Sequence, residues 1–135
     1  MRGDVRRRFA ILLAAALVSL GPRSVNAGRE RLPNRVGECV ATTIKAVGTR
    51  LVDGGEPVEG SGSDVEFTNG GRQVSFDTVP QIDGSRPGDP VQMCLLSVPV
   101  ACPSGDNRGR LYRTTNLRSH QSWVLRDAEH MCGGA

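Results

Sequence analysis

The sequence predicts a small all-β domain, an antiparallel sandwich or partly open barrel of about six strands that is stapled by disulfides. Three observations support this prediction. No segment shows a sustained helical period of apolar side chains. Short runs rich in β-branched and aromatic residues are separated by clusters of Gly, Pro, Asn, Asp and Ser. Four cysteines occur in a chain that has only four aromatic side chains after residue 27.

The first 27 residues have the three parts of an export signal. An arginine-rich stretch up to Arg8 precedes an apolar run at 10–21, and Val25-Asn26-Ala27 supplies small residues for cleavage. Twelve apolar residues span about 18 Å as a helix, which is too short for a hydrocarbon core of about 30 Å. We therefore expect a signal peptide at 1–27, no stable membrane insertion after its removal, and a periplasmic or secreted protein. Arg6-Arg7 also fits a twin-arginine signal, which leaves the export route open.

The chain after residue 27 is long enough for one domain. We expect a flexible segment at 28–38 and a single β domain at 39–135. The whole chain has 17 Lys and Arg against 14 Asp and Glu, but five arginines and one aspartate lie in the expected signal. Residues 28–135 therefore hold 12 basic and 13 acidic side chains. This balance gives no reason to expect nucleic acid as a partner, because nucleic-acid-binding domains are basic.

The strands follow from local composition. Residues 40–52 are rich in β-branched side chains and predict one or two strands, whereas 53–63 has the Gly, Ser, Pro and acidic composition of a loop. Residues 91–98 form the most apolar run of the domain and predict a central strand. A second hairpin is expected from 110–115 and 121–126. A short helical turn is expected at 79–85 or near 127–130.

The strongest local signal is Asn69-Gly70, which lies between the apolar runs 65–68 and 72–76. Asn-Gly tolerates the positive φ angles of a type I′ turn. A two-residue turn pairs Val65 with Val74 and places the apolar side chains of both strands on one face. A three-residue loop would shift the register by one residue and scatter them. A two-residue turn is therefore favoured.

Four cysteines allow three pairings, and spacing alone does not choose between them. We favour Cys39–Cys132 with Cys94–Cys102, because the first and last strands would bring their ends together if they lay side by side. Each disulfide would stabilise the fold by about 2–4 kcal/mol. Zinc binding is a competing interpretation, but the sequence has no C-x-x-C pair. We expect no metal and no cofactor.

Charge is distributed unevenly along the domain. Residues 53–89 hold eight acidic side chains and two arginines, whereas 108–126 hold five arginines and no acid. This pattern fits two solvated faces of opposite sign, or a basic hairpin that meets an acidic partner. Trp, Tyr and Arg are enriched at binding hot spots. The candidate binding residues are Arg110, Tyr112, Arg113, Arg118 and Trp123.

Trp123 has a second possible role, because a domain short of aromatics needs it in the core. If Arg113 lay opposite Trp123 in the second hairpin, its guanidinium would stack on the indole ring. The two interpretations differ in whether the indole is exposed.

The sequence contains no recognisable catalytic signature. The parts of a nucleophilic triad are limited to His120, Ser122, Asp127 and His130, and none lies in a known setting. The stretch Asp106-Asn107-Arg108-Gly109 lacks the repeated spacing of a calcium loop and is expected to be a turn. We predict no catalytic residue, and a small hydrolase that uses His120 or His130 is the alternative.

The second half of the chain carries several short motifs, among them Arg86-Pro87-Gly88-Asp89, Cys102-Pro103-x-Gly105-Asp106, Arg108-Gly109-Arg110-x-Tyr112 and His130-x-Cys132-Gly133-Gly134. On these motifs, residues 80–135 resemble small secreted bacterial proteins without an assigned function. The resemblance implies export and paired cysteines, and it implies no activity. Periplasmic lysozyme inhibitors share the size, β content and disulfides, but their motifs are not evident in this chain.

Together, these features predict an exported, non-enzymatic binding domain, either inhibitor-like or accessory. Its partner would be a protein or a component of the cell envelope. A small secreted hydrolase and a structural envelope protein are the alternatives.

Overall fold

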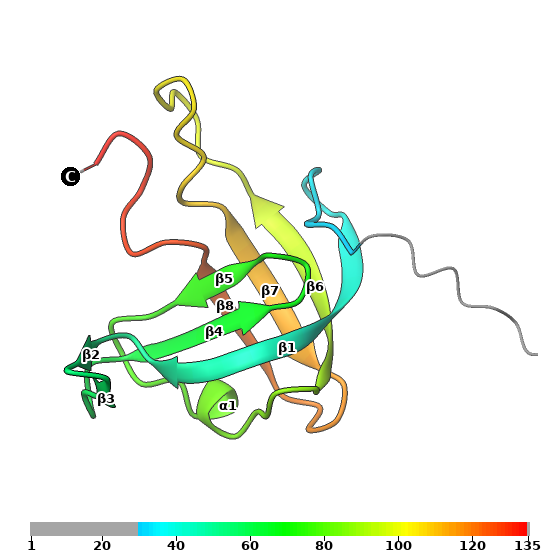
Figure 1. Ribbon diagram of the computed structural model, residues 1–135. Helices are drawn as coiled ribbons and strands as arrows, with labels where there is room; N and C mark the ends of the chain where they lie inside the picture. The colour runs from blue at the N-terminus through cyan, green and yellow to red at the C-terminus, as the bar shows by residue number, and fades with distance from the viewer. Residues whose placement is uncertain (1–29, 135) are drawn as a thin grey trace, which may run out of the picture.

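Six strands close into an antiparallel barrel in the computed structural model, which describes residues 30–134 (Figure 1). The order around the barrel is β1-β4-β5-β8-β7-β6, and β2 and β3 form a separate two-stranded sheet. The predicted all-β class is confirmed, and the barrel is closed. The expected signal at 1–27 lies outside the described residues. The elements are β1 (Cys39–Thr49), β2 (Val52–Asp53), β3 (Glu56–Pro57), β4 (Ser63–Phe67), β5 (Arg72–Val74), α1 (Pro80–Asp83), β6 (Pro90–Ser97), β7 (Leu111–Asn116) and β8 (Ser122–Arg126).

The barrel consists of two successive three-stranded meanders. β1, β4 and β5 form the first and β6, β7 and β8 the second, and they join where β1 pairs with β6 and β5 pairs with β8. The connection from β5 to β6 crosses one end of the barrel and contains α1, as predicted for 79–85 (Figure 1). Ile82 of this helix is fully buried. The opposite end, which we call the mouth, carries the β4–β5 turn, the β6–β7 loop and the C-terminal tail (Figure 1).

The barrel interior is part apolar and part polar. Gln73, Thr114 and Asn116 have no exposed surface. Gln73 Oε1 accepts hydrogen bonds from Thr114 Oγ1 at 3.0 Å and from Trp123 Nε1 at 2.7 Å. Because buried polar groups are costly unless they are paired, these bonds make the mixed interior possible. The apolar part of the core comprises Ile44, Val65, Phe67, Ile82, Val91, Met93, Leu95, Tyr112 and Trp123.

The predicted register of the first hairpin is wrong by one residue. Val65 pairs with Gln73, not with Val74. The turn is longer than expected because Asn69 Oδ1 accepts a hydrogen bond from the Gly71 amide at 3.0 Å, and Phe67 then pairs with Gly71. The expected two-residue turn is therefore a three-residue turn. As a result Gln73 faces the interior, and Phe76 is 54 % exposed.

The second hairpin has the predicted strands, but its register also differs from the expected pairing. Arg113 lies opposite Val124, and Trp123 lies opposite Thr114. The expected stacking of Arg113 on Trp123 is therefore wrong. Alternation along the strands explains the outcome, because Trp123 and Thr114 point into the barrel while Arg113 and Val124 point outward.

The favoured disulfide pairing is wrong as well. The disulfides are Cys39–Cys94 and Cys102–Cys132. The first and last strands are not neighbours, because β1 lies between β4 and β6. Cys39 at the start of β1 faces Cys94 directly across the β1–β6 ladder, with their Cα atoms 4.0 Å apart. Cys132 in the tail is left to join Cys102 in the β6–β7 loop.

The segment before β1 contacts the barrel from Glu30 onward. Its Pro33 is buried, and Leu32 packs against the core. Hydrogen bonds from Arg31 and from the Asn34 amide hold Glu38 and lower the pKa of its carboxyl to about 2. Residues 30–38, which we expected to be part of a flexible segment, thus form one side of the mouth.

A polar network seals the end of the barrel that α1 covers. Asp89 is 5 % exposed and pairs with Arg118, which donates from Nε to Oδ1 at 2.6 Å and from Nη2 to Oδ2 at 2.9 Å. Asn116 Nδ2 and the Arg86 amide also donate to Asp89 Oδ2. Arg118 therefore serves to close this end, and its ion pair holds the pKa of Asp89 well below the ordinary value.

The loop between β3 and β4 contains a close backbone approach at Gly62. Gly62 has a φ of +113°, and a Cβ at this position would lie 1.9 Å from the carbonyl oxygen of Ser75. Gly60, two residues earlier, has a φ of +73° and open space around it. Comparing substitutions at the two positions therefore distinguishes the energetic cost of backbone strain from that of a steric clash.

We expect Gly62→Ala to lower the free energy of unfolding by about 3 kcal/mol or more, because it combines strain with a clash against the backbone. Gly60→Ala, which meets only the strain, should cost about 1–2 kcal/mol. Urea denaturation of both variants measures the difference. Equal losses would contradict the close approach of Gly62 to Ser75.

Asp89→Asn should destabilise the fold by about 2 kcal/mol at neutral pH, because it weakens a buried charge-assisted pair. Since the pKa of Asp89 is lowered on folding, its contribution is complete above the ordinary pKa and is lost as the pH falls below it. The difference in unfolding free energy between wild type and Asp89→Asn should therefore shrink in acid. Asp53→Asn, in exposed β2, is the control, and a difference independent of pH would refute the assignment.

Candidate functional site

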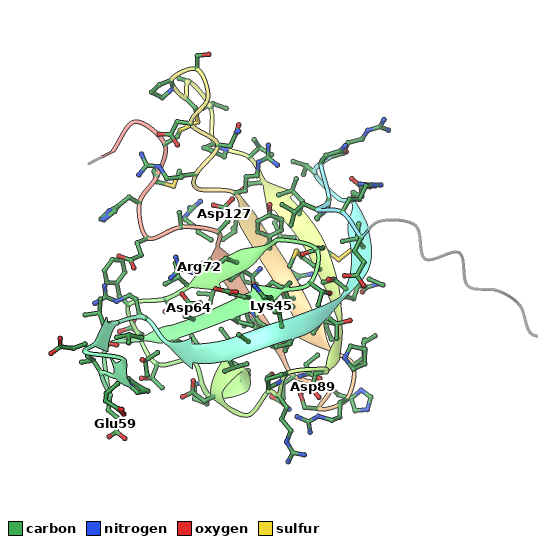
Figure 2. All side chains as sticks on the ribbon, in the orientation of Figure 1. Lys45, Glu59, Asp64, Arg72, Asp89 and Asp127 are labelled. Atoms are coloured by element: carbon green, nitrogen blue, oxygen red, sulfur yellow. A yellow bond between two sulfur atoms is a disulfide. The ribbon has the colours of Figure 1, made fainter. Side chains whose placement is uncertain are left out.

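The sequence-predicted binding residues do not form one surface. Arg110 and Tyr112 lie at the mouth, whereas Arg118 lies at the sealed end in its pair with Asp89. Arg113 is exposed on the outer wall of β7. Figure 2 shows Asp89 and Asp127, which mark the two ends, on opposite sides of the barrel. The second hairpin thus distributes its arginines over the length of the domain.

Trp123 is a core residue. Only 5 % of its surface is exposed, and its indole N–H is bound to Gln73. This position matches the core role that the sequence allowed for it. A ligand at the surface has no access to the indole ring in this arrangement.

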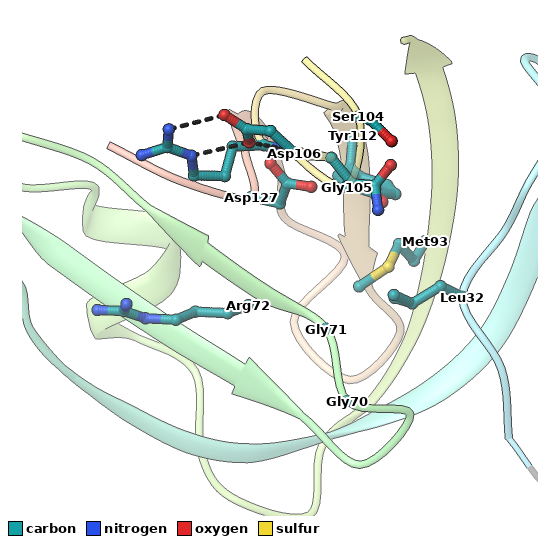
Figure 3. Close-up of a pocket in the computed structure, with 12 residues that line it drawn as sticks. Leu32, Gly70, Gly71, Arg72, Met93, Ser104, Gly105, Asp106, Tyr112 and Asp127 are labelled. Atoms are coloured by element: carbon teal, nitrogen blue, oxygen red, sulfur yellow. Dashed lines mark hydrogen bonds and ion pairs between the residues drawn. The ribbon is translucent and has the colours of Figure 1, made fainter. Parts of the chain in front are cut away.

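A cavity of about 680 Å³ opens at the mouth of the barrel. We call it the mouth cavity. Its floor contains Met93 and Tyr112, which are 1 % and 2 % exposed, and Leu32 lies beside them (Figure 3). The remaining lining residues come from the β4–β5 turn, the β6–β7 loop and the end of β8: Gly70, Gly71, Arg72, Ser104, Gly105, Asp106, Asn107, Arg108 and Asp127.

The glycines of the β4–β5 turn bring main chain close to the floor. A Cβ on Gly71 would lie 2.9 Å from Leu32 Cδ2 and 3.3 Å from Met93 Cε. The side chain of Arg72 extends away from the other lining residues toward Asp64, with which it forms an ion pair (Figure 3). This wall therefore offers backbone and a narrow apolar surface rather than a charge.

The β6–β7 loop is fixed by contacts with the C-terminal tail. Asp106 pairs with Arg108, with 2.8 Å between Oδ2 and Nη2, and Asp106 Oδ2 also accepts the Gly133 amide at 3.0 Å. The Arg108 pair holds the pKa of Asp106 well below its ordinary value. Arg108 Nη2 also donates to the Gly134 carbonyl, and the Cys102–Cys132 disulfide joins the same two segments. These contacts tie the rim of the cavity to the C-terminal tail.

Asp127 and the phenol of Tyr112 contribute further polar groups to the cavity wall. Asp127 Oδ1 accepts the amides of Gly109 at 2.7 Å and Arg110 at 3.1 Å. Burial raises the pKa of Tyr112, and the nearby charge of Asp127 raises it further, while Arg110 opposes the shift. The phenol is therefore neutral at physiological pH.

The two histidines lie far from a triad arrangement. His120 occupies the β7–β8 turn with a φ of +59°, and its amide donates to the Asn116 carbonyl. His130 is exposed after β8, where its ring packs edge-on against Phe76 with the centroids 6.4 Å apart. Ser122 shares a hydrogen bond with Thr115, and Asp127 is bound to backbone amides. Within residues 30–134, no hydrogen bond joins either histidine to Ser122 or Asp127.

The four cysteines are all oxidised in disulfides, so none is available as a thiolate ligand. Across residues 30–134, no three side chains of His, Cys, Asp or Glu gather in a way that would hold a metal ion. In the same part of the chain, no helix has the length and apolar character needed to cross a membrane.

Sequence reasoning missed most of the cavity. Leu32, Met93 and Gly71 were not candidates, and Asp127 was considered only as a member of a triad. The Asn69-Gly70-Gly71 run was the available signal, because consecutive glycines permit a close approach of backbone to a ligand.

Comparison with known proteins adds no assignment: the chain matches no protein-family model, no curated protein and no solved structure. The similarity to small secreted bacterial proteins therefore stays an expectation. Inference about function rests on the geometry of the cavity.

Removal of the Cys102–Cys132 disulfide tests whether it fixes the cavity rim. We expect Cys102→Ser/Cys132→Ser to lower the free energy of unfolding by about 3–4 kcal/mol and to speed amide exchange across 104–108. The matched control, Cys39→Ser/Cys94→Ser, removes the other disulfide, which closes a longer loop of 55 residues against 30. This control should lower the free energy of unfolding by about 4 kcal/mol. It should leave exchange at 104–108 unchanged. Hydrogen-exchange mass spectrometry measures the difference. Equal amide exchange across 104–108 in both variants would refute the role of the Cys102–Cys132 disulfide in fixing the cavity rim.

Proposed function

We propose that this protein is an exported, non-enzymatic binding domain that holds a segment of a partner protein in the mouth cavity. The observation that carries the proposal is the cavity itself, a concave site of about 680 Å³ with an apolar floor and a polar rim. Such sites commonly occur at the mouths of β-barrels and are typical of ligand binding. A component of the cell envelope is the other occupant that the sequence suggested.

The rigid rim supports binding. The disulfide and the contacts of Asp106 with Arg108 and Gly133 fix the loop before any ligand arrives. A preformed site loses less conformational entropy on binding than a mobile one. The β6–β7 loop can therefore contact a ligand without first having to become ordered.

The exported location rests on two arguments. Disulfides form and persist in oxidising compartments, and both pairs of cysteines are joined in this domain. The N-terminal pattern of basic, apolar and small residues is that of a signal peptide. We propose a periplasmic or secreted protein of the kind that the sequence motifs resemble.

The mouth cavity, and not the whole basic hairpin, is the binding site that we propose. Arg113 lies on the outer wall and Arg118 is engaged with Asp89, which leaves Arg110 and Tyr112 near the cavity. The non-enzymatic assignment is supported by the hydrogen bonds within residues 30–134, none of which joins a histidine to Ser122 or Asp127.

A blocking substitution at the rim tests the proposal. Ser104 is exposed and lines the cavity, so Ser104→Trp should obstruct it without disturbing the core. Val100→Trp adds the same side chain to the same loop, at a position that is 88 % exposed and outside the cavity. We expect Ser104→Trp to reduce capture of the partner from native envelope extract at least about tenfold, which corresponds to about 1.4 kcal/mol. Val100→Trp should capture normally.

The outcomes separate the proposals. Equal capture by Ser104→Trp and wild type would contradict binding in the mouth cavity. A hydrolase screen of the purified protein provides the second measurement. Turnover that disappears in His120→Ala or His130→Ala would overturn the non-enzymatic assignment.

A further inference from the structure

We infer that the mouth cavity recognises a basic side chain of its partner, a lysine- or arginine-type group on an apolar stem. This inference rests on the proposed function and specifies the chemistry that the site selects. Three observations support it: the floor of the cavity is apolar, the carboxylate of Asp127 lies in its wall, and the other charged side chains that line it are already in ion pairs.

The floor fits the apolar stem of a long side chain. Leu32 is partly exposed beside Met93 and Tyr112, which lie almost fully buried at the floor of the cavity, and the main chain at Gly71 passes close to Leu32 and Met93. Basic side chains cover apolar surface with their methylene groups while the charged end reaches a polar partner. The lined volume of about 680 Å³ accommodates one such side chain with part of its backbone.

Asp127 supplies the negative charge. Its Oδ1 is occupied by the amides of Gly109 and Arg110, which fix the orientation of the carboxylate. No hydrogen bond among residues 30–134 involves Oδ2. Figure 3 shows Asp127 beside Tyr112 on the side of the cavity opposite Gly70 and Gly71. A held carboxylate with one open oxygen is a suitable acceptor for an ammonium or guanidinium group.

The other charged residues that line the cavity are already paired. Asp106 is matched by Arg108, and Arg72 is matched by Asp64. Asp127 is therefore the lining carboxylate whose charge is not balanced by an ion pair in the described residues. Arg110 interacts with Tyr112 but does not line the cavity, and it is the group that would favour an anion instead.

Blocked tripeptides provide the probe. NMR titration of the purified protein would use acetyl-Gly-Lys-Gly-amide, the same peptide with norleucine in place of lysine, and the same peptide with glutamate. We expect the lysine peptide to bind at least about tenfold more tightly than the norleucine peptide, with shifts at Asp127 and Tyr112. The free amine n-pentylamine should bind more weakly than the lysine peptide if a protein side chain is the ligand. Equal or tighter binding of the amine, or a preference for glutamate, would overturn the inference.

Asp127→Asn is the decisive variant. The amide keeps an oxygen that can accept the Gly109 and Arg110 N–H groups, but it removes the charge. The preference for lysine over norleucine should fall about tenfold or more in this variant and persist in Asp53→Asn, which removes one charge from exposed β2. If Asp127→Asn fails to fold, the salt dependence of the wild-type titration serves instead. Lysine binding that does not weaken between 20 mM and 500 mM salt would contradict an ionic contact.

The experiment distinguishes the inference from the proposed function. If Ser104→Trp loses the partner but Asp127→Asn captures it normally, the cavity binds a protein and the basic-group inference is wrong. If Ser104→Trp captures normally, the proposed site is wrong, whatever the tripeptides do.

Discussion

Closure of the barrel depends on the buried side chain of Gln73. β5 is three residues long and pairs with β8 at a single position, Val74 with Arg126. Gln73 adds a connection through the interior, because its Oε1 binds Thr114 of β7 and Trp123 of β8. The two bonds form although Gln73 Nε2 has no acceptor among the described residues. The junction of the two meanders therefore relies on a side chain where the backbone ladder is shortest.

The mouth cavity depends on the same interaction. When Gln73 points into the barrel, Gly71, the residue just before β5, lies against Leu32 and Met93. A register shifted by one residue would turn Val74 inward and change which backbone atoms approach the floor. The hydrogen bonds that close the barrel and the shape of the proposed binding site are thus two consequences of one register.

Local features of the fold were predictable from the sequence, and pairings between distant segments were not. The six barrel strands, the turn at α1 and both hairpins follow from composition and from the positions of Asn and Gly. The short pair of β2 and β3 does not, because it lies within 52–57, most of which was expected to be loop. The register of the first hairpin does not, because the rule that apolar residues share a face ignores a buried Gln73 and the side-chain bond of Asn69 to Gly71. The cysteine pairing depends on which strands are neighbours, and Cys39 meets Cys94 only because β6 lies beside β1. The cavity joins 70–72, 104–108 and Asp127, which no local pattern connects.

The two ends of the barrel use similar chemistry to opposite effect. At the sealed end, both oxygens of Asp89 are engaged by Arg118, Asn116 and the Arg86 amide, and Ile82 fills the space beneath. At the mouth, the bonds within residues 30–134 fix Asp127 through one oxygen, to two backbone amides, and no helix of this part of the chain covers the floor. Because no arginine of the described residues forms an ion pair with Asp127, its second carboxylate oxygen is open to a group that enters the cavity. Burial of an unpaired charge is unfavourable. A cation that enters the mouth would therefore be stabilised by pairing with a carboxylate that the fold has already oriented.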